Sequence, residues 1–126
     1  MESDNPWPAP TPSPAKRVLV VEDDRDIREL LVELLESEGY QVSSAENGAQ
    51  ALLKAKVGRP HLILLDLMMP IMNGWQFREQ QVKEPAISKV PVVVISAFAN
   101  DLQVAGCLRK PVRIEDVLDA VHQHAA

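Results

Sequence analysis

Residues 62–70 read LILLDLMMP, and this stretch decides the fold because an unbroken apolar run leads directly into a carboxylate. Arg59-Pro60 precedes the run, and Pro70 with Asn73-Gly74 follows it. Such a run is typical of a strand that is buried on both faces of a parallel sheet. Asp66 then lies at the carboxyl end of the strand, the edge where open α/β sheets bind ligands. A turn cap is the alternative explanation for a lone acid in this position.

Length and composition limit the chain to one globular domain. The 126 residues are 46% hydrophobic and 25% charged, and no apolar run approaches the roughly 18 residues that a membrane span needs. The amino terminus has acids and prolines where a signal peptide would have a basic and an apolar segment. The single cysteine, Cys107, agrees with a reducing compartment. We therefore expect a cytoplasmic protein without a membrane segment.

The charge pattern argues against direct contact with nucleic acid. The net charge is −5, and the 13 Lys and Arg residues are scattered along the sequence. Nucleic-acid-binding domains usually gather such residues into a basic patch or stripe.

The first 15 residues differ in composition from the rest, with prolines at positions 6, 8, 10, 12 and 14. A segment of this composition cannot bury a core. We expect a disordered Pro-rich tail at 1–15 and one folded domain at 16–126.

From residue 16 onward, apolar strands alternate with segments of helical periodicity. The expected strands are 18–21, 40–45, 62–66, 91–96 and a weak one around 107–108, and the expected helices are 26–38, 49–57, 74–83 and a last one from about Ile114. Alternation of this kind predicts parallel strands joined by right-handed crossovers, with helices on both faces. The fold class is therefore α/β, a doubly wound five-stranded parallel sheet of the flavodoxin-like type.

Polar residues follow several of these strands, and the topology brings them to one edge. They are Glu22, Asp23, Asp66, Ser96 and Lys110. Three carboxylates that meet at one edge repel each other unless a cation is present, and hard oxygen ligands suit Mg²⁺. A carboxylate can also attack phosphorus, with a fixed cation and a hydrogen-bond donor beside the phosphoryl oxygens. The alternatives are a solvated acidic turn, a strand-end cap at Ser96 and a surface lysine at Lys110.

Four motifs together resemble the receiver domain of two-component response regulators. They are Val20-Val21-Glu22-Asp23-Asp24, Asp66-Leu67-Met68-Met69-Pro70 with Asn73-Gly74, Ser96-Ala97 and Lys110-Pro111. The resemblance implies that Asp66 accepts a phosphoryl group from a histidine kinase or a phosphotransfer protein. The domain would then signal to a downstream protein by direct contact, as a self-phosphorylating and self-dephosphorylating acceptor rather than a turnover enzyme.

The same resemblance assigns a role to each site residue. Asp23 and Asp66 would ligate Mg²⁺, with Glu22 acting through water and the backbone carbonyl of Met68 completing the set. Ser96 would be the switch hydroxyl. Lys110 would bind the phosphoryl oxygens, ahead of a cis Lys110-Pro111 bond.

Two departures from the family pattern stand out. Cys107 takes the position of the usual aromatic switch residue. The segment at 97–106 is shorter than in the family by about two helical turns, so we expect a shortened or absent fourth helix. These departures favour an alternative function, a pseudo-receiver that acts as a phosphorylation-independent docking module.

Two other classes of protein fit the sequence less well. A phosphatase of the haloacid dehalogenase kind needs a second acid two residues after its nucleophile, where this chain has Met68. A dinucleotide-binding domain needs a glycine-rich loop after its first strand, and Glu22-Asp23-Asp24 occupies that position.

Overall fold

The computed structural model describes residues 16–97 and 102–125. In chain order its elements are β1 (Arg17–Val21), α1 (Arg25–Ser37), β2 (Gln41–Ala45), α2 (Gly48–Gly58), β3 (Leu62–Asp66), α3 (Gly74–Val82), β4 (Val92–Ser96), β5 (Gly106–Arg109) and α4 (Ile114–His124). The predicted tail at 1–15 lies outside the described residues, so the division into tail and domain stays a prediction.

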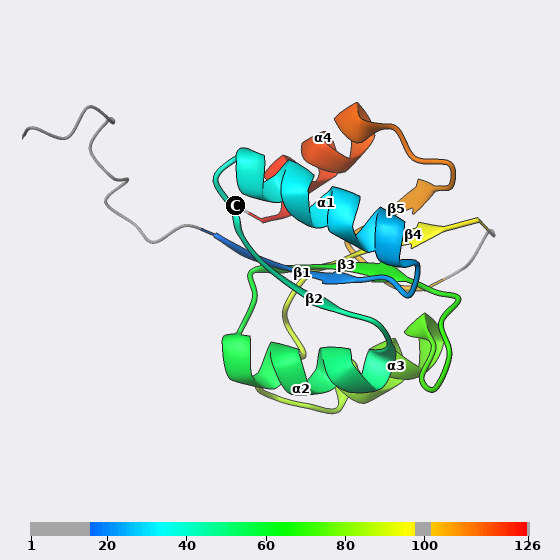
Figure 1. Cartoon of the computed structure of the whole chain (residues 1–126). Coiled ribbons are helices and arrows are strands. Elements are labelled where there is room, and N and C mark those ends of the chain that lie inside the picture. Colours follow the sequence, from blue (N-terminus) through cyan, green and yellow to red (C-terminus); the bar gives the residue numbers. More distant parts are fainter. Residues whose placement is uncertain (1–15, 98–101, 126) are drawn as a thin grey trace, which may run out of the picture.

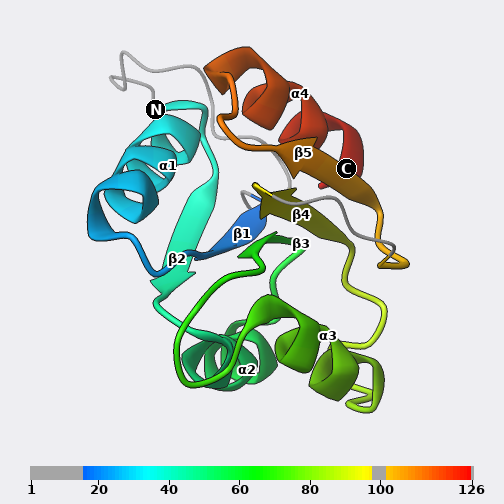
Figure 2. The same ribbon diagram turned by 90° about the vertical axis from the view of Figure 1, so that its right-hand side faces the viewer.

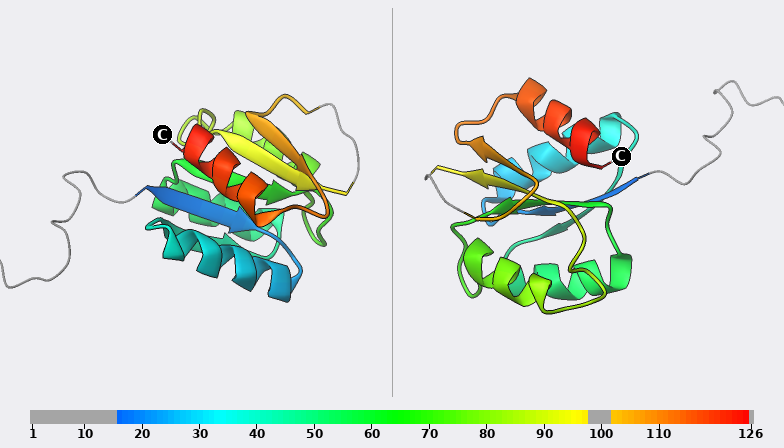
Figure 3. Two further views of the ribbon diagram at one scale, coloured as in Figure 1. Left: turned by 90° about the horizontal axis from the view of Figure 1, so that it is seen from above. Right: turned by 180° about the vertical axis from the view of Figure 1, so that it is seen from behind.

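The strands form one parallel sheet in the order β2-β1-β3-β4-β5. Helices α1 and α4 cover one face, and α2 and α3 cover the other (Figures 1 and 2). The strand arrows point toward the same edge of the sheet (Figure 3). The predicted doubly wound α/β fold is confirmed.

Alternate residues of the central strands fill two separate cores. Ile63 and Leu65 of β3 face the core under α2 and α3, whereas Leu62 and Leu64 face the core under α1 and α4. All five residues of β3 are buried. A shift of one residue would exchange the two sets of side chains, so burial on both faces holds the strand register firmly. The position of Asp66 at the end of β3 is thereby fixed.

Side-chain caps define where three of the helices begin. Asp24, Asn47 and Asn73 each accept a hydrogen bond from the backbone amide three residues later. Asn73 forms a full capping box with Gln76, because the Gln76 side chain accepts a hydrogen bond from the Asn73 amide at 3.0 Å. Caps of this kind stabilise a helix start by about 1 kcal/mol each. They also fix the length of the loops at the carboxyl edge of the sheet.

The connection between β4 and β5 is the unusual part of the fold. Ala97 and residues 102–105, the part of this connector that the structure describes, contain no helix. The expected shortening of the fourth helix is confirmed, and the helix labelled α4 is the last one in the chain. Leu102 and Val104 pack against the core under α2 and α3 instead.

A polar network from α3 holds this connector. Arg78 donates one hydrogen bond from Nη2 to the Gln103 carbonyl at 2.7 Å and one from Nη1 to Gln81 Oε1 at 2.8 Å. Gln81 is fully buried, and its Nε2 donates to the carbonyls of Ile87 and Val90 at 2.9 and 3.0 Å. One buried amide therefore links the connector, α3 and the loop that leads to β4.

Among the described residues, no helix has the length and apolar character required to cross a bilayer.

Ile71 adopts a strained backbone conformation in the loop between β3 and α3. Its φ is 68°, and the Met72 amide donates to the Pro70 carbonyl at 2.7 Å across it. This geometry is a γ-turn of the strained positive-φ form. A β-branched residue disfavours positive φ, and the Ile71 side chain is 83% exposed, so packing offsets little of the cost.

We predict that Ile71→Asn stabilises the domain by about 1 kcal/mol, because Asn tolerates positive φ far better than a β-branched residue. Urea unfolding of the purified chain measures this change. Ile71→Val is the matched control, since it keeps the β-branch, and it should leave the free energy of unfolding near its original value. Equal values for the Asn and Val variants would contradict the prediction.

Candidate functional site

Three carboxylates meet at the carboxyl edge of the sheet. Ligand oxygens of Glu22, Asp23 and Asp66 all lie within 4.8 Å of one another. Strands β1 and β3 are neighbours with Val21 paired to Leu65, so the residues that follow these strands are brought side by side. Glu22 and Asp66 are buried, whereas Asp23 is exposed to solvent.

Lys110 directly follows β5 and reaches this acidic group along the same edge of the sheet. Its Nζ lies 3.1 Å from Glu22 Oε1 and 3.5 Å from Asp66 Oδ1. The backbone amide of Lys110 donates to the Ser96 carbonyl at 2.8 Å, which ties the end of β5 to the end of β4. The Lys110-Pro111 bond is cis, as the family resemblance implied.

The two remaining predicted site residues lie beside this group. Ser96 is buried at the end of β4, and its neighbour Ile95 pairs with Asp66 across the sheet. Met68 lies in the loop after β3, where its amide donates a weak hydrogen bond of 3.4 Å to Asp66 Oδ1. The Met68 side chain is half exposed. The roles that the sequence suggested for these residues stay predictions.

Close packing of α3 against the end of β3 depends on Gly74. A Cβ atom at this position would lie 2.7 Å from both the Asp66 carbonyl oxygen and the Leu67 Cα. The Gly74 amide donates to the Leu67 carbonyl at 2.9 Å. The first residue of α3 therefore braces the backbone of Asp66, and only glycine fits there.

Arg28 is a part of the site that the sequence analysis missed. Its Nη1 donates to the carbonyl oxygens of Glu22 at 3.0 Å and Asp23 at 3.3 Å. No sequence signal singled it out, because a charged residue on an amphipathic helix is normally a solvated one.

Burial is the main reason that the pKa of Glu22 is raised from 4.5 to about 7. The Asp24 amide and the Lys110 ammonium lower the pKa of Glu22, while the charge of Asp66 adds to the rise. For Lys110, burial lowers the pKa, but the hydrogen bond and charge of Glu22 together with the charge of Asp66 outweigh it, and the net shift is upward. Glu22 and Lys110 therefore act directly on each other, and the charge of Asp66 acts on both.

This donor set fits a hard metal cation. All three side chains offer carboxylate oxygens, the ligands that Mg²⁺ and Ca²⁺ prefer. A divalent cation would also offset the cost of burying the Glu22 carboxylate beside Asp66, which raises the pKa of Glu22.

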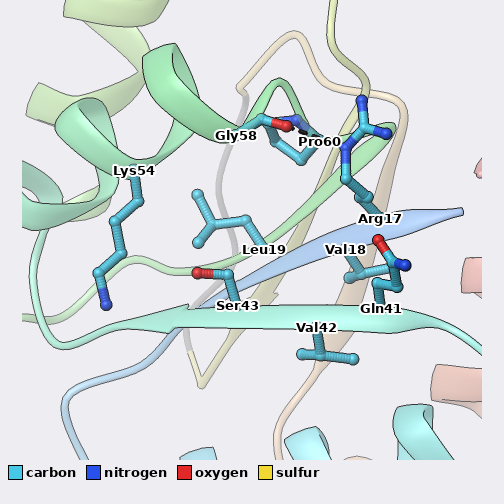
Figure 4. Close-up of a pocket in the computed structure, with 9 residues that line it drawn as sticks. All are labelled: Arg17, Val18, Leu19, Gln41, Val42, Ser43, Lys54, Gly58 and Pro60. Carbon is cyan, nitrogen blue, oxygen red and sulfur yellow. Dashed lines mark hydrogen bonds between the residues drawn. The ribbon is translucent and has the colours of Figure 1, made fainter.

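Two of the hollows among the described residues are relevant to the site. An apolar groove of about 480 Å³ runs between α1 and α4, and Lys110 borders it at the end near the acids. A smaller cavity of about 220 Å³ lies at the opposite edge of the sheet, between α2 and the starts of β1 and β2 (Figure 4). There Arg17 Nε donates to the Gly58 carbonyl at 2.9 Å, so that this side chain caps the end of α2. The groove between α1 and α4 is the hollow that adjoins the acidic group.

Comparison with known proteins identifies the family. The model of the response regulator receiver domain matches residues 18–122. The chain therefore belongs to the family of response regulator receiver domains and to two-component signalling. This family membership excludes both other classes considered from the sequence, a phosphatase of the haloacid dehalogenase kind and a dinucleotide-binding domain.

Individual relatives give the same result. The protein PilH of Pseudomonas aeruginosa is 35% identical over 80 residues, which are 64% of this chain and 66% of PilH. The polar-differentiation response regulator DivK of Brucella anthropi is 27% identical over 117 residues, covering 86% of this chain and 95% of DivK. Among solved structures, the chemotaxis protein CheY4 of Vibrio cholerae is 26% identical and has a TM-score of 0.81, covering 87% of this chain and 98% of that one.

We predict that without metal the original chain loses more stability than Glu22→Gln as the pH rises from about 5 to about 8. The folded state holds the Glu22 proton up to about pH 7, whereas an ordinary Glu loses it near 4.5. The raised pKa of Glu22 therefore contributes stability that is fully present below pH 4.5, the pKa of an ordinary Glu. This stability is lost as the pH rises through about 7, the pKa of Glu22 in the folded chain. Urea unfolding in EDTA at several pH values measures the difference. Parallel curves for the two proteins would contradict it.

Proposed function

We propose that Asp66 accepts a phosphoryl group from a histidine kinase or a phosphotransfer protein, and that the phosphorylated domain signals by contact with a downstream protein. One observation carries the proposal: a single ammonium, that of Lys110, contacts both Glu22 and Asp66 at the end of the buried strands. Membership of the receiver family supports the same reaction.

In the proposed reaction, an Asp66 carboxylate oxygen forms a bond to phosphorus while the bond from phosphorus to the donor's imidazole nitrogen breaks. Lys110 would neutralise charge on the phosphoryl oxygens, and the Ser96 hydroxyl would donate a hydrogen bond to one of them. Hydrolysis of the acyl phosphate by water would release inorganic phosphate and return the original carboxylate. The chain is then an acceptor that modifies itself rather than a turnover enzyme.

Asp23, Asp66 and the Met68 carbonyl would hold Mg²⁺, with Glu22 acting through a water molecule. When bound, Mg²⁺ supplies positive charge that neutralises the phosphoryl oxygens and the acids around them. The difference in burial supports this assignment. Glu22 and Asp66 are buried, whereas Asp23 is exposed, and the exposed side leaves room for the waters that Mg²⁺ usually keeps.

The alternative of a pseudo-receiver is not favoured. Cys107 in place of the aromatic switch residue and the short connector after β4 were the reasons for considering it. The acidic group and Lys110 oppose it, since a docking module has no need to keep mutually repelling buried acids. A location in the cytoplasm is part of our proposal, because donor and acceptor must share a compartment and a lone cysteine agrees with a reducing one.

We predict that Asp66→Asn abolishes phosphoryl incorporation from acetyl phosphate, and that Asp23→Asn reduces it strongly. The first variant lacks the nucleophile and the second lacks a metal ligand. Intact mass spectrometry in Mg²⁺ measures the added phosphoryl group, with Asp26→Asn on the exposed side of α1 as the matched control. Undiminished labelling of Asp23→Asn, or full labelling of the original chain in EDTA, would refute the proposed reaction.

The donor protein would dock in the apolar groove between α1 and α4. Leu30 of α1 and Ile114 of α4 are large apolar residues that remain 55% and 49% exposed at its rim. Lys110 joins the groove to the acidic group, so a protein seated in it would lie beside Asp66. Burial of such residues in a protein contact is worth about 1.5–3 kcal/mol for each side chain.

We predict that Leu30→Glu slows phosphoryl transfer from a protein donor by tenfold or more, which corresponds to about 1.4 kcal/mol. Labelling from acetyl phosphate should stay unchanged, since a small donor does not need the groove. Leu53→Glu is the matched control, because Leu53 is 65% exposed on α2, across the sheet from the groove. An equal effect of both variants on the protein donor, or an equal effect of Leu30→Glu on both donors, would count against this docking site.

A further inference from the structure

We propose that Arg28 is a positioning residue that holds the acids of the β1–α1 loop in the geometry that binds the metal. The inference rests on the proposed Mg²⁺ site, but it concerns a residue that none of the sequence motifs contains. Arg28 lies in the second turn of α1, so its side chain can turn back over the loop that leads into the helix.

The geometry is specific. One guanidinium nitrogen, Nη1, donates to two successive carbonyl oxygens, those of Glu22 at 3.0 Å and Asp23 at 3.3 Å. Both carbonyls belong to residues whose side chains form the acidic group. Arg28 therefore holds the peptide planes on both sides of Asp23.

The two acids differ in how much else restrains them. Glu22 is buried, pairs with Lys110 and accepts a hydrogen bond from the Asp24 amide at 3.2 Å. Asp23 is exposed, so packing does little to hold its side chain. We therefore expect the bond from Arg28 to matter most for the direction in which Asp23 points.

Removing Arg28 has two opposing effects on cation binding. The loss of a positive charge near three carboxylates favours a cation, whereas the loss of the two hydrogen bonds loosens its ligands. The guanidinium is partly exposed, and near a protein surface the effective dielectric constant is high, so the loss of its charge changes cation binding only modestly. The bonds that orient metal ligands typically change metal affinity by about 10- to 100-fold. We therefore expect the loss of geometry to outweigh the gain in charge.

Isothermal titration of the metal-free chain with MgCl₂ tests the inference. Arg28→Lys keeps the charge, but its side chain is one bond shorter and its ammonium ends short of the position of Nη1, whereas Arg28→Gln removes both the charge and the reach. We expect the Kd for Mg²⁺ to rise about tenfold in each variant. Arg25→Gln is the matched control, because Arg25 lies at the same end of α1 and pairs with the exposed Glu29 instead of the loop. Its Kd should stay the same or fall.

Each other outcome has a definite meaning. An unchanged Kd in Arg28→Lys with tighter binding in Arg28→Gln would show that Arg28 acts only through its charge, and would overturn the inference. An unchanged Kd in both, with a lower free energy of unfolding in urea, would reduce Arg28 to a structural role. If Arg28→Gln fails to fold, Arg28→Lys alone decides. If the original chain binds no Mg²⁺, the proposed metal site itself fails, and the inference with it.

Discussion

The burial of two neighbouring carboxylates is the constraint on which the rest of this site depends. Glu22 and Asp66 end two neighbouring strands, and the pKa of Glu22 rises to about 7 because it is buried beside a second acid. Isolated charges of this kind would disrupt most protein interiors. Here they persist because the strands beneath them are buried along almost their whole length and cannot move apart. The apolar sheet holds the two acids in place, and Lys110 pairs with both of them.

The same arrangement explains why the loops around the site are held so tightly. Asp24 and Asn73 cap the helices that follow the two acidic strands, and Gly74 lets α3 approach the backbone of Asp66. Arg28 restrains the loop between β1 and α1 by donating hydrogen bonds to the carbonyls of Glu22 and Asp23. A charged site gains most from rigid surroundings, because fixed groups need not reorganise when charge arrives.

Much of this could be predicted from the sequence. The apolar runs gave every strand to within one or two residues, and the parallel topology explains why Glu22, Asp23, Asp66 and Lys110 converge. The γ-turn at Ile71 could not be predicted, since local preference argues against positive φ at a β-branched residue. The bonds from Arg28 and Arg78 were also missed. Such contacts depend on side-chain rotamers across the tertiary structure, and hydrophobic periodicity carries no information about them.

The connector between β4 and β5 gives this receiver room to diverge. Leu102, Val104 and the guanidinium of Arg78 help to hold the described part of this segment, Ala97 and residues 102–105. A substitution at Arg78 would release the Gln103 carbonyl, while the Gln81 amide could still keep the underlying loop in place. The connector could therefore change its path at Gln103 while the residues of the acidic site keep their contacts with one another.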